Sequence, residues 1–357
     1  MVIIAFDSHK RYTFSSVENE KGKIIDERRI DHKAGALMEY LSRFPKGSEV
    51  AVETIGNWYW IVDEIEKAGM KPLLVHARKA KLLSGSANKT DRLDARAMNK
   101  LNRANILPTV WIPPREVRDK RDVLRTRMRF VNQRTQLKNR MHGILSQYAL
   151  NKFEASDIYG KRNRAELELR LDMLPQETRV DAFSSLHMID TFSEELLVLE
   201  KRIMELFDSS EDAQLIETIP GIGFLLSTVI IHEIGDIGRF PSAEHFASYS
   251  GTTPRVHSSG GKTRYGRLRK DVNHYLKWAF SEAGNSVCVN HTRKPELHVS
   301  KLYSRVRSRK GHSIAIGAVA RHIAESCFWV LSKGEAYKEP QKRSHQGKRR
   351  RVPVVNR

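Results

Sequence analysis

The order of the apolar segments near the N-terminus is the feature that most limits how this chain can fold. Three segments with strand-like patterns come first, separated by polar or glycine-containing turns, over residues 2–9, 13–19 and 22–30. Helix and strand patterns then alternate over residues 32–44, 48–56, 57–70, 71–77 and 90–104. Strands that first form hairpins and then alternate with helices are typical of a mixed α/β sheet. We therefore predict an α/β domain over residues 1–110, with Thr90 as the N-cap of its last helix.

Residues 111–210 have a different, helical pattern. Apolar residues recur there at three- and four-residue spacing in two long stretches, with polar breaks around Gly160 and Pro175. Two long helices of this kind can fold back as a hairpin within one chain, or pair between chains as a coiled coil. Helical patterns also dominate residues 211–337, so the predicted fold class of the whole chain is α/β plus all-α.

The first of the two long helices is strongly basic and has few acids to offset its cations. A run of like charge is usually a solvated helix face. Because the imbalance of sign is so large here, we favour a surface that follows the backbone of a nucleic acid. The residues assigned to this surface are Arg121, Arg125, Arg129 and Lys138.

Two motifs stand out in residues 211–337. A helix, the turn Pro-Gly-Ile-Gly at residues 220–223 and an apolar helix follow the pattern of a helix-hairpin-helix, whose turn can offer N–H groups to a phosphate. A tight glycine turn between two core helices explains the same pattern equally well. Residues 246–280 are expected to form a basic, glycine-rich loop that runs into a helix. The basic tail, residues 338–357, is expected to be disordered when free and to order on nucleic acid.

The overall charge indicates a polyanionic partner. The net charge is +20 and the pI is near 9.9, and each neutralised phosphate releases counterions, which strengthens binding. Nucleic acid is the leading candidate, with a ribosome-associated protein or a merely solvated basic surface as alternatives.

The two cysteines lack metal-ligand spacing, which argues against a disulfide framework and a structural zinc. The first apolar run is too short for a signal peptide, and no stretch approaches the roughly 20 apolar residues that span a bilayer. We therefore expect a cytoplasmic protein with no membrane partner.

Four carboxylates have positions that predict a metal site. Asp7 lies inside an apolar strand and Glu53 at the end of another, where an unpaired charge is costly to bury. Asp91 and Asp94 lie three residues apart on one face of a helix, where like charges repel without a counter-ion. Helix-start chemistry explains Asp91 alone, and an ion pair with Lys10 or a distant arginine explains Asp7 alone. All four together favour a divalent metal.

Hard cations such as Mg²⁺ prefer carboxylate oxygens. Two such ions, about 4 Å apart, can stabilise both the attacking and the leaving oxygen of a phosphoryl transfer. We therefore predict a two-ion Mg²⁺ site, with Mn²⁺ as a substitute.

At this point the sequence resembles a known family. The aspartate of the first strand, the later strand glutamate and the block NKTDRLDARAM are followed by a basic helical middle, IPGIG and GTTPRVHSSGGKTRYGR. This order is similar to that of the DEDD transposases of insertion sequences, also called bridge-RNA-guided recombinases. The resemblance covers nearly the whole chain, and the combination of the three blocks makes it specific.

The resemblance implies a domain order and a set of site residues. It implies an N-terminal RuvC-like domain with the RNase H fold, a coiled-coil segment and a mainly helical transposase domain with a nucleophilic serine. The positions that match the catalytic, metal-binding acids are Asp7, Glu53, Asp91 and Asp94. The family's serine directly precedes a glycine, which places it at Ser259, with Ser258 as the adjacent alternative. In an extended segment His257 points to the same side as Ser259 and to the other side from Ser258.

Four further cations accompany this serine in the sequence. Guanidinium and ammonium groups so placed would bind phosphates and offset charge in the transition state. They are Arg255, Lys262, Arg264 and Arg267.

The function implied is that of a DNA transposase or recombinase of an insertion sequence. Its expected partners are donor and target DNA, a structured guide RNA encoded by the element, and further copies of the chain in a dimer or tetramer. The resemblance also implies that the N-terminal domain of one copy meets the transposase domain of another. Two alternatives remain: a metal-dependent nuclease or Holliday-junction resolvase that hydrolyses DNA, and a non-catalytic nucleic-acid-binding protein.

Overall fold

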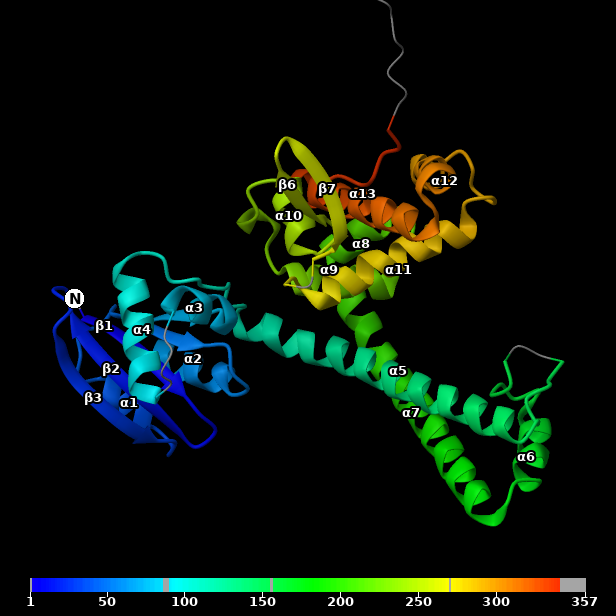
Figure 1. The fold of residues 1–357 in the computed structure, drawn as a ribbon, viewed down its shortest axis with the longest axis horizontal. Coiled ribbons are helices and arrows are strands. Elements are labelled where there is room, and N and C mark those ends of the chain that lie inside the picture. The colour runs from blue at the N-terminus through cyan, green and yellow to red at the C-terminus, as the bar shows by residue number, and fades with distance from the viewer. Residues whose placement is uncertain (1, 86–89, 155–156, 270, 341–357) are drawn as a thin grey trace, which may run out of the picture. The chain divides into compact units, whose positions relative to one another are not determined.

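The computed structural model describes residues 2–85, 90–154, 157–269 and 271–340. The chain divides into two compact units, residues 1–114 and residues 115–357, which are described separately here (Figure 1). The first unit extends slightly beyond the predicted boundary at residue 110, because the linker TVWIPP belongs to it. Most of the predicted basic tail, from residue 341 onward, lies outside the described residues.

The first unit is built on a five-stranded mixed sheet. Its strands are β1 (Val2–Ser8), β2 (Tyr12–Asn19), β3 (Ile24–Asp31), β4 (Glu49–Glu53) and β5 (Lys71–Val75). The strand order is β3-β2-β1-β4-β5. The first three strands pair antiparallel, and β4 lies parallel to both β1 and β5. This topology confirms the predicted mixed sheet.

Helices cover both faces of this sheet (Figure 1). They are α1 (Ala36–Leu41), α2 (Trp58–Lys67), α3 (Ala77–Ser84) and α4 (Asp91–Arg103). The side chains of β1 alternate, so Ile4 and Phe6 pack in one core with α1 and α2, whereas Ala5 packs in a second core with α4. Thr90 caps α4 as predicted, since its hydroxyl accepts a hydrogen bond from the N–H of Leu93 at 3.3 Å. Helix α3 was not predicted.

The second unit is mainly helical. Its elements are α5 (Arg115–Gln147), α6 (Arg164–Asp172), α7 (Gln176–Asp208), α8 (Glu211–Glu217), α9 (Phe224–Ile234), η1 (Ile237–Arg239), α10 (Ala243–Tyr249), β6 (Pro254–Ser259), β7 (Lys262–Leu268), α11 (His274–Asn290), α12 (His298–Lys310) and α13 (His312–Lys333). The long helices α5 and α7 pack against each other within the chain, with Phe130 against Phe192. A supercoiled geometry for this pair stays a prediction.

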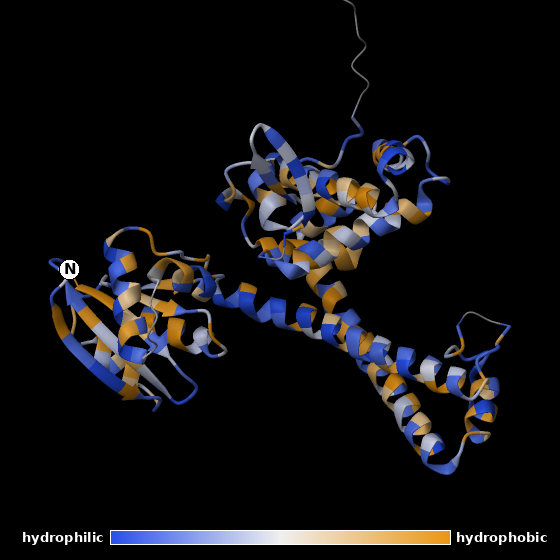
Figure 2. Cartoon of the chain, viewed as in Figure 1, coloured by the Kyte–Doolittle hydropathy of each residue, from blue (hydrophilic) through white to orange (hydrophobic). Residues whose placement is uncertain are grey.

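The main core of the second unit lies among α9, α11 and α13. Helix α13 is long and apolar enough, by length and composition, to cross a membrane, so the expectation that no stretch approaches this length was wrong. In the structure α13 packs against α10, α11 and α12, and its Ala315, Val319 and Ile323 are fully buried. Its apolar composition is therefore explained by its place in the core. Figure 2 shows the contrast with α5, whose N-terminal half is largely hydrophilic.

The Pro-Gly-Ile-Gly turn joins α8 to α9 as the sequence predicted. Gly221 has a φ of +95°, and a Cβ there would lie 2.6 Å from the carbonyl oxygen of Ala283 on α11. Only glycine fits so close an approach. Ile219 and Ile222 on either side are buried. This packing favours the glycine-turn explanation over the phosphate-binding one.

Candidate active site

The register of the sheet brings the first two predicted acids together. Strands β1 and β4 run parallel, and Phe6 lies opposite Val52 in the ladder. The next residue on each strand is Asp7 and Glu53, so both acids lie at the carboxyl ends of neighbouring strands. The Asp7 side chain is only 13% exposed, which makes a lone negative charge there unfavourable.

Helix α4 supplies the other two acids from its first turn. Thr90 fixes where the helix begins, and Asp91 and Asp94 then share the face that packs toward β1 and β2. Acids in a first turn are also favoured by the helix dipole. The two acids also affect the first strand, because the negative charges of both raise the pKa of Asp7.

Salt bridges behind the acids fix α4 on the sheet. Arg96 donates two hydrogen bonds to the carboxylate of Glu27 on β3, at 2.6 and 2.7 Å. One turn further on, the buried amide of Asn99 donates to the carbonyl of Ser16 on β2. These contacts set the rotation of α4 and therefore the direction in which its acids point.

Two site residues were missed by the sequence analysis. His9 places its Nε2 atom 3.4 Å from Asp7 and 3.3 Å from Asp91, and the three side chains form a group able to hold a metal ion. Tyr12 donates a hydrogen bond of 2.9 Å from its hydroxyl to Asp91. A signal for His9 existed, because alternation along the strand places residues 7 and 9 on the same face.

The electrostatics of the acid cluster fit a divalent cation. Burial raises the pKa of Asp7 from its ordinary 3.8 to about 6; His9 opposes this shift, and the other three acids add to it. Ionising Asp7 is unfavourable because it is buried and three further acids lie nearby. A cation bound among the four acids would stabilise the ionised form. The oxygen donors of the four acids, with the imidazole of His9 beside them, are suitable ligands for such an ion.

The predicted nucleophile lies in the second unit, on a β-hairpin. The expectation of a glycine-rich loop was wrong for this part of residues 246–280: β6 and β7 pair antiparallel, with Ser259 opposite Lys262 and Ser258 opposite Thr263. Gly260 and Gly261 form the two-residue turn, with φ values of +55° and +74°. Two positive φ values are what a tight hairpin turn of type I′ requires.

The hairpin separates the two serines. Because side chains alternate along each strand, Ser259 shares one face with His257, Lys262 and Arg264. Ser258 lies on the other face, where its hydroxyl is 3.4 Å from that of Thr263. All of these residues are exposed.

Two of the four cations predicted to bind nucleic acid on the basic helix α5 make contacts inside the fold. Arg121 is buried and donates to the carbonyls of His232 and Glu233, and Arg125 makes two hydrogen bonds with the Glu233 carboxylate. These two arginines join α5 to α9, so their places do not support a role in binding phosphates. Arg129 is exposed and contacts Thr126, and the ammonium of Lys138 lies 4.5 Å from the ring centroid of Tyr159.

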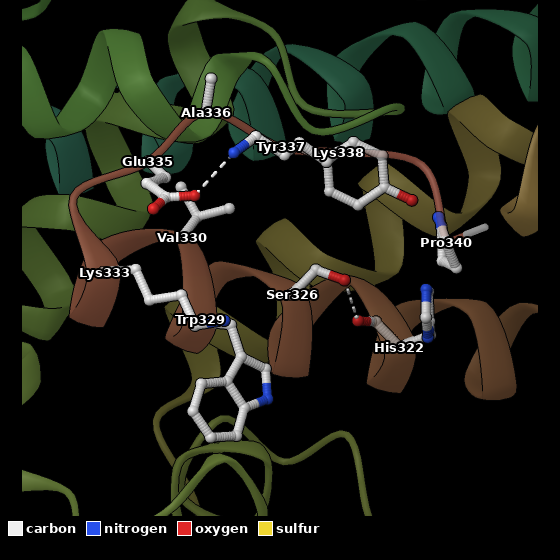
Figure 3. A pocket seen from close by; sticks show the side chains of 10 residues that line it. All are labelled: His322, Ser326, Trp329, Val330, Lys333, Glu335, Ala336, Tyr337, Lys338 and Pro340. Atoms are coloured by element: carbon white, nitrogen blue, oxygen red, sulfur yellow. Dashed lines mark hydrogen bonds and ion pairs between the residues drawn. The ribbon is translucent and has the colours of Figure 1, made fainter.

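A separate pocket lies where residues 335–340 run along α13 (Figure 3). Trp329 and His322 of α13 line it together with Tyr337. None of the predicted site residues lines this pocket, so it has no part in the acid site or the serine hairpin.

Comparison with known proteins places this geometry in a family. A family model for transposases of the DEDD type, named for the insertion sequence IS110, matches residues 4–150, and the model of the IS116/IS110/IS902 transposase family matches residues 213–299. The chain belongs to the IS110 family of DEDD transposases. The first match contains the four acids and the second contains Ser259. The mixed sheet of the first unit agrees with the RNase H-like domain expected of a DEDD transposase, and this domain type implies a divalent metal.

Individual relatives of this IS110-family transposase agree. The transposase of insertion sequence element IS1111A from Coxiella burnetii is 26% identical, over 90% of this chain and 86% of its own length. A probable family 20 transposase from Pseudomonas aeruginosa is 24% identical, over 81% of this chain and 85% of its own. A pilin gene-inverting protein from Moraxella bovis is 28% identical, over 58% of this chain and 57% of its own.

Proposed function

We propose that this DNA transposase cuts and rejoins DNA in the cytoplasm by forming a covalent link between Ser259 and a DNA phosphate. The observation that carries the proposal is the way the β6–β7 hairpin presents this serine. Ser259 is exposed next to the turn and shares its face with Lys262 and Arg264. Cations so placed attract a phosphate to the serine and stabilise the charge that develops during attack.

In the covalent step, the bonds formed and broken and the protons transferred are as follows. The Ser259 oxygen forms a bond to phosphorus, one phosphorus–oxygen ester bond of the DNA breaks, and the serine proton leaves while the released DNA oxygen gains a proton. Rejoining reverses these changes with an oxygen of another DNA strand as the attacking group. Because serine is a weak nucleophile at its free pKa, it needs activation.

Asp7, Glu53, Asp91 and Asp94 would hold Mg²⁺, in a two-ion arrangement that Mn²⁺ can also occupy. When bound, these ions would lower the charge on the phosphate oxygens and activate the nucleophile. The support for this part is the mutual effect of the four acids on the pKa of Asp7.

We further propose that donor and target DNA are chosen by a structured RNA encoded with the element, and that several copies of the chain act together as a dimer or tetramer. The guide RNA rests on the family resemblance and on the net charge of +20. Sequencing the RNA that copurifies with the protein tests it, since its loops should match the element ends and the target. Recovery of no structured RNA would remove this part of the proposal and leave the chemistry untouched.

The nucleophile is tested by trapping protein covalently attached to DNA and resolving the adduct on a denaturing gel. Ser259→Ala should abolish the adduct. Ser258→Ala is the matched control, because it removes the neighbouring hydroxyl from the opposite face of the same hairpin, and it should leave the adduct in place. An unchanged adduct in Ser259→Ala would show that another residue is the nucleophile.

The acid cluster alone would also serve a second function, metal-dependent hydrolysis of DNA. That enzyme would release free DNA ends without an adduct, and Ser259→Ala would keep its activity. Asp7→Ala should abolish cleavage under either mechanism. Full activity of Asp7→Ala would favour a non-catalytic nucleic-acid-binding protein.

A further inference from the structure

The face of the β6–β7 hairpin opposite Ser259 carries an exposed apolar pair. Val256 and Tyr265 lie directly opposite each other in the ladder. Val256 is 57% exposed and Tyr265 is 73% exposed. An aromatic ring and a branched aliphatic side chain held together in water are an unfavourable arrangement that a binding partner can relieve.

The surroundings of this pair indicate what the partner is. The hairpin contains no acid over residues 254–268, and its cations are Arg255, Lys262, Arg264 and Arg267. A protein partner of ordinary composition would have to bury this one-sided charge, whereas DNA neutralises it. A two-stranded ribbon is also narrow enough to enter a groove of DNA.

We infer that Tyr265, backed by Val256, stacks on a base of the DNA that the transposase cuts. The cationic face with Ser259 holds the sugar-phosphate backbone, and the opposite face holds the base. Aromatic side chains stack on bases of any sequence, so the contact positions a strand without reading it. This inference rests on the proposed role of Ser259 for the statement that the strand is the one being cut.

The register of the β6–β7 hairpin also sets the distance between the inferred base contact at Tyr265 and the phosphate contact at Ser259. Three ladder positions separate Ser259 from Val256, which is about 10 Å along a strand. Successive nucleotides are about 3.4 Å apart along one DNA strand. The stacked base therefore lies within about three nucleotides of the phosphate that Ser259 attacks.

The test uses a DNA probe of mixed sequence with a short unpaired loop, and a fully paired probe of the same sequence. Binding is measured by fluorescence anisotropy. Tyr265→Ala should weaken binding to the looped probe roughly tenfold, as expected for the loss of one stacked base, with little effect on the paired probe. Tyr265→Phe should bind as the wild type does, and Thr263→Ala is a control on the same face. Equal affinity of Tyr265→Ala and wild type for the looped DNA would overturn the inference.

A crosslinking experiment identifies the contact directly. Iododeoxyuridine in the unpaired loop should crosslink to Tyr265 on irradiation, and mass spectrometry of the peptide should locate the link. A crosslink elsewhere, with none to Tyr265, would contradict the stacking contact. An RNA probe of the same shape is the competing arm: loss of RNA binding alone in Tyr265→Ala would overturn the assignment to DNA.

Two further measurements separate this inference from its alternatives. Binding and crosslinking are repeated in Ser259→Ala, where the Tyr265 contact should persist even though no covalent adduct forms. If Ser259→Ala still forms the adduct while Tyr265 crosslinks, the proposed nucleophile is wrong and the stacking contact stands. Light scattering measures the size of the assembly, and a smaller assembly in Tyr265→Ala with normal DNA binding would assign this face to a second copy of the chain instead.

Discussion

At the scale of single residues, Asp7 combines a structural cost with the chemical role that we propose for it. The carboxyl group is only 13% exposed and lies 3.4 Å from the Nε2 atom of His9, and the ligand atoms of Asp7, His9 and Asp91 all lie within 4.8 Å of one another. Its raised pKa means that ionising it in the folded protein costs free energy. A bound cation would reverse that cost.

The replacement Asp7→Asn should therefore stabilise the metal-free protein at neutral pH. The folded pKa, about 6, is above the ordinary 3.8, so the wild type loses stability as the pH rises from about 4 to 6, by at most about 3 kcal/mol. Asparagine does not ionise and should not show this loss. The measurement is the melting temperature against pH in a chelator, followed by addition of Mg²⁺ or Mn²⁺. The metal should raise the melting temperature of the wild type and leave that of Asp7→Asn unchanged, and an equal rise in both would contradict the assignment.

The residues of this site differ in how far the sequence could predict them. Asp7 and Glu53 were predictable because a charged residue in an apolar strand is conspicuous, and Thr90 because capping is a local property. Tyr12 was not, because it contacts Asp91, which lies about eighty residues away in the sequence. For His9 the alternation along the strand was a signal of its place beside Asp7, but its contact with the distant Asp91 could not be foreseen. The contacts of Arg121 and Arg125 inside the fold could not be foreseen for the same reason, since their buried partner Glu233 is more than a hundred residues distant.

At the scale of elements, the hairpin and the joint between α5 and α9 are the informative cases. Local pattern failed for the hairpin because both of its faces are exposed, so no alternation of apolar and polar residues marks the strands. The double glycine was the available signal, since two adjacent glycines between extended segments are typical of a two-residue turn. The turn determines which side chains share a face with Ser259.

Substitutions at Gly260 should test the turn. Its φ of +55° is unfavourable for a branched side chain, whereas asparagine tolerates this region. Gly260→Val should lower the yield of the Ser259 adduct at least severalfold, and Gly260→Asn should preserve it. The exposed hairpin contributes little to the core, so the melting temperature should be the same in both. Equal adduct yields in the two variants would mean that the turn does not control the serine.

The joint between α5 and α9 should be a main source of stability in the second unit. The Glu233 side chain is 2% exposed and pairs with Arg125, and Asn273 at the start of α11 donates to it at 2.9 Å. Glu233→Ala leaves the buried guanidinium of Arg121 and the partly buried one of Arg125 without their counter-charge, which should cost about 3–5 kcal/mol of unfolding free energy. Glu200→Ala is the matched control, because its pair with Arg127 is partly exposed and should contribute at most about 1 kcal/mol. Urea unfolding measures both, and similar losses would contradict the central role of Glu233.

At the scale of the whole molecule, the residues of the two proposed chemistries lie in separate compact units, the four acids in the first and Ser259 in the second. The sequence predicted this separation, because the strand pattern ends before the helical pattern begins. It could not show how the net charge of +20 is divided between exposed cations and cations used inside the fold. Whether a cation is exposed depends on partners far away in the sequence, such as Glu233. Only the exposed cations are available to DNA.

The salt dependence of DNA binding should show which cations are exposed and contact phosphates. The logarithm of the DNA-binding constant falls linearly with the logarithm of salt concentration, with a slope of about 0.9 for each phosphate neutralised. Replacing an exposed hairpin cation, as in Lys262→Gln or Arg264→Gln, should reduce the slope by about one for each phosphate that is no longer neutralised. Glu200→Gln, which frees the guanidinium of Arg127 from its partner, should not reduce the slope and serves as the control. Because Arg125 is engaged with Glu233, Arg125→Gln should lower the stability of the protein and leave the slope unchanged. A reduced slope for a well-folded Arg125→Gln, with no change for Lys262→Gln and Arg264→Gln, would place the DNA on α5 and away from the hairpin.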